Sequence, residues 1–223
     1  MKLVESDEEQ LEQLKNWWDE NGTSLVLTVV IALGGVFGFR AWEANVQQTG
    51  EAASAAYEDL VAAVENIDAD EEIMRATAQS LATTLRSDFE GSAYSVFGAL
   101  HMARLAVDAG DLDTAQSELE WALENAGEPQ LDTLIRIRLA RVLNASGDAT
   151  AAMALLIKHE PPVGQLVSFE ETRGDTFHAL GDLMNARDAY QKAIDALAEG
   201  ETRPLLELKL ADISKTPAAD EGA

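Results

Sequence analysis

The sequence contains no cysteine, so disulfide bonds, thiol catalysis and cysteine-ligated zinc are excluded. Basic residues are also scarce: 16 lysines and arginines stand against 40 aspartates and glutamates, which gives a net charge of −24 at pH 7. A surface with this excess of negative charge repels the phosphate backbones of nucleic acids. Nucleic-acid binding is therefore not expected.

Recognisable catalytic and ligand-binding motifs are missing too. HExxH, GxSxG and glycine-rich phosphate loops do not occur, and His101, His159 and His178 stand far apart in the chain. The acidic cluster DADEE (68–72) has Ile73 where an EF-hand needs its glycine, so it is better interpreted as an acidic helix start, which the helix dipole favours. We expect no catalytic residue, no cofactor and no metal site.

Long apolar runs are absent except for one, SLVLTVVIALGGVFGF at residues 24–39. Extended through Trp42 and folded as a helix, it would reach roughly 28 Å, close to the thickness of about 30 Å of a membrane hydrocarbon core. A buried core helix would show a polar stripe. A cleaved signal peptide would show a basic start and a small-x-small site. The run has none of these features, so we predict an uncleaved transmembrane helix over residues 23–42.

The basic residues near this helix indicate its orientation. Lys2 and Lys15 precede it, whereas Arg40 lies at its far edge and the next basic residue is Arg75. Lysine and arginine accumulate on the cytoplasmic side of membrane helices. We therefore expect residues 1–22 to form a short acidic cytoplasmic segment, with the rest of the chain on the other side of the membrane.

Beyond the anchor, apolar residues follow helical spacing. Tyr57, Leu60, Val61 and Val64 stand at positions i, i+3, i+4 and i+7, as on one face of a helix. No stretch of useful length alternates with period two. The soluble part is therefore predicted to be all-α.

An internal repeat organises the second half of the chain. The pair Gly-Asp recurs at 110–111, 147–148 and 181–182, with spacings of 37 and 34 residues. Glycine suits a left-handed turn at the end of one helix, and aspartate caps the start of the next. A small residue stands seven positions before and five after each glycine, so that the two helices can cross closely. These repeat-packing residues are Ala103, Ala115, Ala140, Ala152, Gly174 and Ala186.

This layout is that of tetratricopeptide repeats, helix-turn-helix units of about 34 residues; the alternative is an ordinary helical bundle. We predict a tetratricopeptide-like solenoid of helical hairpins over residues 43–213. Residues 51–86 add a hairpin without the turn signature, and residues 203–213 form a capping helix. Residues 214–223 form a flexible tail. Ala149, in the first turn of its helix, is expected to face outward.

Several stretches carry a resemblance to a known family. They are LEQLKNWWDENG (11–22) before the anchor, FGFRAW (37–42) at its exit, and SAAYEDLVAAVE (54–65), IRLARV (137–142) and GDLMNARDAYQKAI (181–194) in the helices beyond. In order and architecture, the chain resembles the YfgM-type ancillary subunits of the bacterial SecYEG translocon. The resemblance covers almost the whole chain.

That resemblance implies a location and partners. It implies an inner-membrane protein with a cytoplasmic N-terminus, one crossing and a periplasmic repeat domain. It also implies association with SecYEG and with a membrane-anchored periplasmic chaperone of the prolyl-isomerase type. The expected function is a non-enzymatic adaptor or chaperone-like helper that also meets emerging polypeptides. The alternatives are an envelope scaffold for another machine, such as division or outer-membrane assembly, and an enzyme with an unrecognised site.

Two surfaces are candidate binding sites. Gly34 and Gly38 form a GxxxG step where a second transmembrane helix could approach closely. In the repeats, the first helix of each pair is expected to line a groove for an extended peptide, although its apolar members could equally be buried core. The candidate groove residues are Phe97, Leu100, Arg104, Leu134, Ile137, Arg141, Asn144, Glu171, Asp175 and His178.

Overall fold

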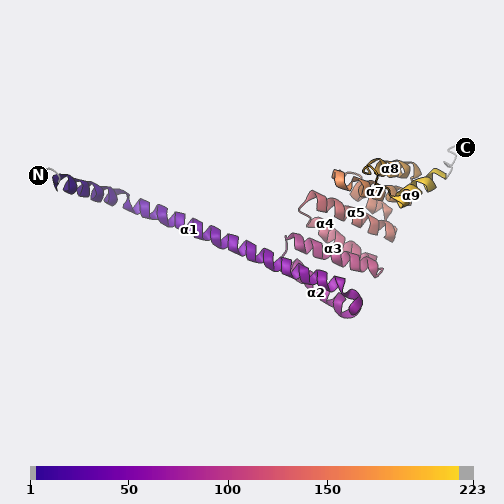
Figure 1. Cartoon of the computed structure of the whole chain (residues 1–223), viewed down its shortest axis with the longest axis horizontal. Coiled ribbons are helices and arrows are strands. Elements are labelled where there is room, and N and C mark those ends of the chain that lie inside the picture. Colours follow the sequence, from indigo (N-terminus) through magenta and orange to yellow (C-terminus); the bar gives the residue numbers. More distant parts are fainter. Residues whose placement is uncertain (1–3, 216–223) are drawn as a thin grey trace. The chain divides into compact units, whose positions relative to one another are not determined.

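The structure is a computed structural model that describes residues 4–215, and every regular element in this range is helical (Figure 1). The expected all-α class is therefore confirmed. Two short 3-10 helices, η1 (Ile67–Ala69) and η2 (Val163–Gln165), lie just before α2 and α7. The α-helices are α1 (Val4–Glu65), α2 (Glu71–Asp88), α3 (Ala93–Asp108), α4 (Leu112–Glu124), α5 (Pro129–Ser146), α6 (Ala149–Leu156), α7 (Leu166–Ala179), α8 (Leu183–Asp195) and α9 (Pro204–Lys215).

The chain divides into two compact units, Met1–Ala52 and Ala53–Ala223. The first unit contains the apolar run within α1. Its large apolar side chains are exposed, from 43% for Leu25 to 67% for Phe37, so the run is not a core helix. Within residues 4–215, α1 is the only helix long and apolar enough to cross a membrane.

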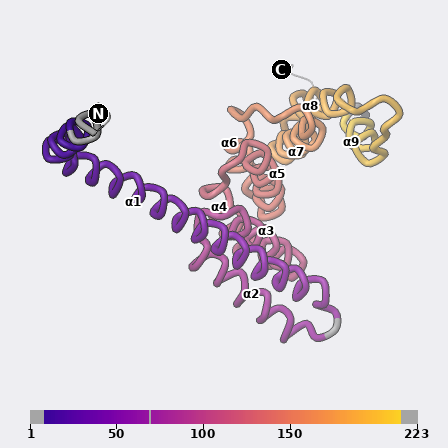
Figure 2. Tube along the Cα trace, turned by 60° about the vertical axis from the view of Figure 1, so that its left-hand side comes forward, coloured from indigo at the N-terminus to yellow at the C-terminus, as the bar shows by residue number. Residues whose placement is uncertain are grey.

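The second unit is a series of helical hairpins. Figure 2 shows α2 running beside the end of α1, and this pair occupies the region where a hairpin without the turn signature is expected. The pairs α3/α4, α5/α6 and α7/α8 follow, and α9 packs on α8 through Leu206 and Ile213. Helix α9 thus takes the place of the expected capping helix. Of the expected tail, residues 216–223 lie outside the described residues.

The three Gly-Asp turns adopt one conformation, illustrated by the turn between α5 and α6. The N–H of Gly147 donates to the carbonyl of Asn144 at 3.2 Å, and the N–H of Asp148 donates to that of Leu143 at 2.8 Å. The carboxylate of Asp148 then accepts the N–H of Ala151 at 2.9 Å. The glycine closes one helix while the aspartate caps the next, as the repeat predicts. The glycines in this left-handed conformation, with φ of 76°, 89° and 77°, are Gly110, Gly147 and Gly181.

The predicted repeat-packing residues stand one on each helix from α3 to α8. Gly174 has the least room, because a Cβ built on it would overlap the ring of Tyr190 on α8. A close helix crossing of this kind tolerates only a very small side chain. The structure buries all six residues, namely Ala103, Ala115, Ala140, Ala152, Gly174 and Ala186.

The prediction that Ala149 faces outward is wrong, because its side chain is only 7% exposed. Helix α6 has just eight residues, and its buried positions are Ala149, Ala152, Met153 and Leu156. These stand at i, i+3, i+4 and i+7, which is the apolar stripe of an amphipathic helix. Ala149 therefore shares the core face with Ala152.

Candidate functional site

Two adjoining cavities lie between α3 and α5 in the second unit. One has a volume of about 300 Å³ and the other of about 270 Å³. Leu100, Arg104 and Arg138 line both, so the two cavities share a wall, and together we call them the α3–α5 groove. Its lining combines apolar side chains with cationic ones, a composition suited to a segment of protein chain.

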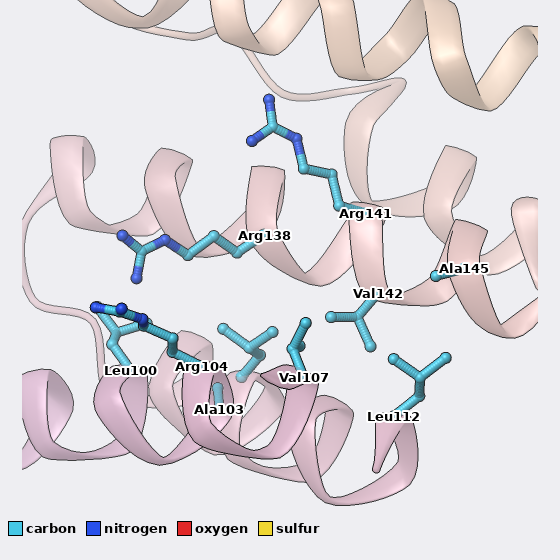
Figure 3. Close-up of a pocket in the computed structure, with 10 residues that line it drawn as sticks. Leu100, Ala103, Arg104, Val107, Leu112, Arg138, Arg141, Val142 and Ala145 are labelled. Carbon is cyan, nitrogen blue, oxygen red and sulfur yellow. The ribbon is translucent and has the colours of Figure 1, made fainter. Parts of the chain in front are cut away.

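The larger cavity is apolar at one end and cationic at the other (Figure 3). Val107, Leu112 and Val142 form the apolar end. The side chains of Arg104 on α3 and Arg138 on α5 extend together toward the opposite end. The cavity can therefore contact both an apolar part and an anionic part of a ligand.

Aromatic rings line the smaller cavity. The ring centroid of Tyr57, from the end of α1, lies 5.8 Å from those of both Phe97 and His101 on α3. The Tyr57 hydroxyl also lies 3.2 Å from Nε2 of His101. These contacts hold the rings in place, and rigid aromatic groups are effective contact surfaces for protein partners.

The arginines of the groove lack strong anionic partners. In the part of the chain that the structure describes, no carboxylate forms an ion pair with Arg138 or Arg141, whereas Arg104 has an exposed pair with Asp108 at 3.7 Å. Burial and the charges of Arg141 and Arg104 lower the pKa of Arg138. Burial, followed by the charges of Arg104 and Arg138, likewise lowers the pKa of His101. Like charges therefore crowd together in a strongly acidic protein.

Some of the predicted apolar groove residues line a cavity, and others are buried in the core, the alternative that the sequence left open. Phe97 and Leu134 are half-buried and line the smaller cavity. Leu100 is 7% exposed and forms part of the wall of both cavities. Ile137 is 2% exposed and belongs to the core cluster, so the buried reading applies to it.

Arg141 and Asn144 connect α5 to the next first helix, α7. Nε of Arg141 donates to the Thr172 hydroxyl at 3.0 Å, and Nδ2 of Asn144 donates to the Thr176 hydroxyl at 2.8 Å. Arg141 is still exposed and lines the larger cavity. Asn144 is thus a packing contact between repeats, whereas Arg141 keeps part of its guanidinium available.

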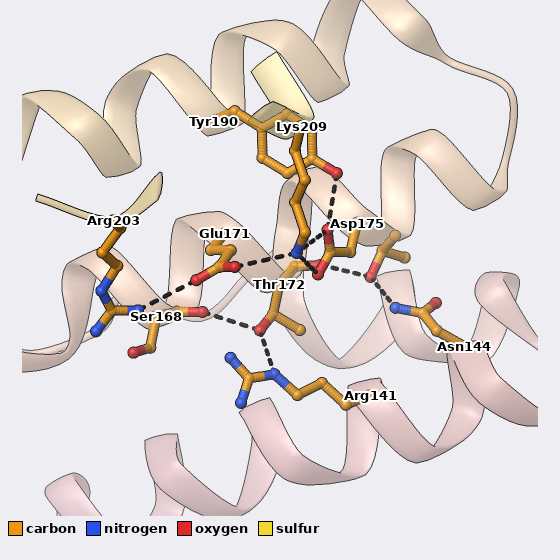
Figure 4. A network of polar contacts seen from close by, with 10 residues as sticks. Arg141, Asn144, Ser168, Glu171, Thr172, Asp175, Tyr190, Arg203 and Lys209 are labelled. Carbon is orange, nitrogen blue, oxygen red and sulfur yellow. Dashed lines mark hydrogen bonds and ion pairs between the residues drawn. The ribbon is translucent and has the colours of Figure 1, made fainter. Parts of the chain in front are cut away.

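The acidic residues on α7 are bound within the chain by cations from its C-terminal part (Figure 4). Nζ of Lys209 lies 3.0 Å from Glu171 and 2.8 Å from the Asp175 carboxylate, while Nη1 of Arg203 lies 3.1 Å from Glu171. Asp175 also accepts the Tyr190 hydroxyl at 2.7 Å. Burial opposes ionisation of Glu171, but its hydrogen bond to Lys209 and the charges of Lys209, Arg141 and Arg203 outweigh burial and lower its pKa. At this end of the repeats, α9 therefore occupies the surface that was predicted for a partner.

The other predicted positions have few contacts. His178 near the end of α7 is exposed. Gly34 and Gly38 are exposed on α1, and a Cβ built on either would meet no atom within 4 Å. Among the described residues, no group of three or more His, Cys, Asp or Glu side chains could hold a metal ion.

Arg138 was missed by reasoning from the sequence. The predicted face of α5 used the spacing of Leu134, Ile137 and Arg141, but the residues of α5 that line the cavities include Leu134, Arg138 and Arg141. These stand at i, i+4 and i+7, a spacing equally compatible with one helix face. The signal that could have revealed Arg138 is its basic character, since a charged residue is unlikely to point into a core.

A family model described as a tetratricopeptide repeat-like domain matches residues 15–215. The match includes the apolar run and all the hairpins. No solved structure matches the chain significantly.

Curated relatives are similar over most of their length. A protein of Haemophilus influenzae is 28% identical over 84% of this chain and 88% of its own. One of Escherichia coli is 26% identical over 96% of this chain and 100% of its own, and one of Aggregatibacter actinomycetemcomitans is 29% identical over 86% and 91%. All three carry the name ancillary SecYEG translocon subunit, which confirms the resemblance predicted from the sequence.

Proposed function

Because this chain belongs to the tetratricopeptide repeat-like domain family, we propose that it acts as a membrane-anchored accessory subunit of the Sec translocon. In this role it binds protein partners through its helical repeats and catalyses no reaction. The observation that carries the proposal is that the similarity to named translocon subunits extends through both the apolar run and the hairpins, over 96% of the chain in one case. A similarity limited to the repeats would fit many unrelated scaffolds.

The proposed location is the bacterial inner membrane, with residues 1–22 in the cytoplasm and the hairpins in the periplasm. The exposed apolar side chains of α1 support the anchor, and the positions of Lys2 and Lys15 support the orientation. Because the chain has no cysteine, a single introduced cysteine reports on one site. Asn16 and Ala198 are both exposed and suitable for this purpose.

Labelling of spheroplasts with a membrane-impermeant maleimide tests the orientation. We expect Ala198→Cys to react in intact spheroplasts and Asn16→Cys to react only after permeabilisation. The opposite pattern would show that the hairpins lie in the cytoplasm.

Within the membrane, we propose that Gly34 and Gly38 contact a helix of the translocon. Hydrophobic exclusion does not drive association between helices in lipid, so close approach through small residues is needed. Replacing both glycines with isoleucine should preserve insertion but reduce recovery of the channel during purification in mild detergent. Gly35→Ile is a suitable control, since Gly35 is equally exposed but lies off the GxxxG face.

In the periplasm, we propose that the hairpins bind a membrane-anchored chaperone of the prolyl-isomerase type and meet emerging polypeptides. The α3–α5 groove and its rim, including Phe97, Leu134 and Arg141, are the surface that supports this role. Affinity purification of the full chain in mild detergent, with partners identified by mass spectrometry, tests the whole proposal. Recovery of division or outer-membrane assembly proteins in place of the channel would favour the scaffold alternative.

A further inference from the structure

Charged side chains at the two ends of the repeat domain differ in whether they have ion-pair partners within the chain. On α7, the carboxylates of Glu171 and Asp175 are bound by Lys209 from α9. Between α3 and α5, no carboxylate of the described residues pairs with Arg138. The chain supplies cations for the carboxylates at one end of the surface, whereas at the other end only Arg104 among the groove arginines of the described residues has a carboxylate partner, Asp108.

Arg104, Arg138 and Arg141 are exposed, so their guanidinium groups are accessible to a ligand. Partial burial, followed by the neighbouring charges of Arg141 and Arg104, lowers the pKa of Arg138, so an anion bound beside it would relieve the repulsion among the three guanidinium groups. The chain has 40 acidic residues, so carboxylates are abundant. Among the described residues, only Arg104 of these three arginines has a carboxylate partner, Asp108 at 3.7 Å, so the group can still bind an anionic part of a ligand.

The lining beside the arginines restricts what that ligand can be. Leu100 lies beside the guanidinium groups of Arg104 and Arg138, and Val107, Leu112 and Val142 form the apolar end of the same cavity (Figure 3). A small inorganic anion would leave these walls uncovered, whereas a peptide with an apolar side chain next to a carboxylate would contact both parts. The two adjoining cavities offer room for more than one apolar side chain.

We propose, on the basis of the function proposed above, that the α3–α5 groove binds partner segments in which an aspartate or glutamate stands beside a large apolar residue. The apolar side chain enters the larger cavity, and the carboxylate accepts hydrogen bonds from the guanidinium groups of Arg104 and Arg138. Such charge-assisted bonds are short and directional. The groove thus selects acidic amphipathic segments from among the polypeptides that the domain meets.

Selection from a library of random peptides displayed on phage, with the full chain in mild detergent as the target, tests this specificity. We expect selected peptides to be enriched in Asp or Glu beside Leu, Ile or Phe. The double variant Arg104→Gln, Arg138→Gln should lose the acidic enrichment. Arg136→Gln is the matched control on α5, because Arg136 is already paired with Asp132 at 2.7 Å and lines neither cavity.

Affinity for one selected peptide gives the quantitative test. Fluorescence anisotropy should show binding at least about tenfold weaker for the double variant, since the loss of even one of its two charge-assisted contacts has about that effect. Replacing the acidic residue of the peptide with its amide should weaken binding to the unchanged protein equally but have little further effect on the double variant. Selection of basic or purely apolar peptides, the absence of selected peptides, or binding of anionic lipid vesicles to the groove instead would overturn the proposal.

Thermal unfolding provides an independent readout that does not depend on a ligand. If the arginines are held together against their mutual repulsion, Arg138→Gln should unfold at the same temperature as the unchanged chain or at a higher one, whereas Arg136→Gln should unfold at a lower one. Lower stability of Arg138→Gln would mean that the arginine has a structural role. None of these measurements requires the channel, so failure here is separate from failure of the channel to co-purify.

Discussion

Replacing Gly174 with alanine should destabilise the repeat domain, although the same change stabilises most helices. A Cβ at this position would overlap Cδ1 and Cε1 of Tyr190 and lie 3.1 Å from its Cγ. The ring has little freedom to move away, because Tyr190 is 2% exposed and its hydroxyl donates to Asp175 at 2.7 Å. Relief of the overlap would therefore need movement of α7 against α8.

The expected magnitude follows from two opposing effects. Overpacking of a rigid core site costs about 3 kcal/mol at the upper end of the usual range, while alanine gains about 1 kcal/mol over glycine in a helix. The net destabilisation of Gly174→Ala should therefore be about 2 kcal/mol. Gly50→Ala on α1 has no atom within 4 Å of the new Cβ and lies in the first unit, so this control should not destabilise the repeat domain.

Urea unfolding of the full chain in mild detergent, followed by far-UV circular dichroism, measures these differences. A double-mutant cycle with Tyr190→Leu isolates the contact, since the smaller side chain removes the ring that the new methyl group meets. On that background Gly174→Ala should be neutral or stabilising, which corresponds to a coupling of about 2 to 3 kcal/mol between the two sites. A coupling below about 0.5 kcal/mol would refute the reasoning, because the cost would then not arise from the ring.

Two further predictions concern the helix crossings and the C-terminal cap. Ala152→Arg should destabilise the domain by several kcal/mol, since the residue is 0% exposed and a guanidinium there would be both too large and unpaired. Thr150 on the same helix is exposed, so the control Thr150→Arg should change stability by no more than about 0.5 kcal/mol. Equal midpoints in urea would contradict the repeat register. Lys209→Met should increase hydrogen exchange in α9, because the buried carboxylate of Glu171 loses a partner at 3.0 Å. Because the pKa of Glu171 is lowered in the folded protein, the stability contributed by this pair is complete above the usual carboxyl pKa of 4.5 and is lost as the pH falls through the lower folded value. The difference in hydrogen exchange between Lys209→Met and the unchanged chain should therefore shrink in acid.

The sequence by itself determined the features that depend on local chemistry. The Gly-Asp turns could be predicted because only glycine adopts the left-handed conformation cheaply and because aspartate caps the following helix wherever the pair occurs. The candidate membrane helix could be predicted because the length of the apolar run and its lack of charge are properties of the segment alone. Small residues at regular distances from each turn, such as Ala152, likewise marked positions that the structure buries.

Only the tertiary structure decided which faces remain open. Helical spacing fits both Ile137 and Arg138 equally well, and the packing of neighbouring helices placed the first in the core and the second in the groove. Ala149 lies on the core face because the short helix α6 uses both of its turns for packing. Asp175 was a plausible groove residue until α9, distant in sequence, brought Lys209 against it. Contacts between distant segments leave no periodic trace in either segment, which is why the groove had to be located in three dimensions.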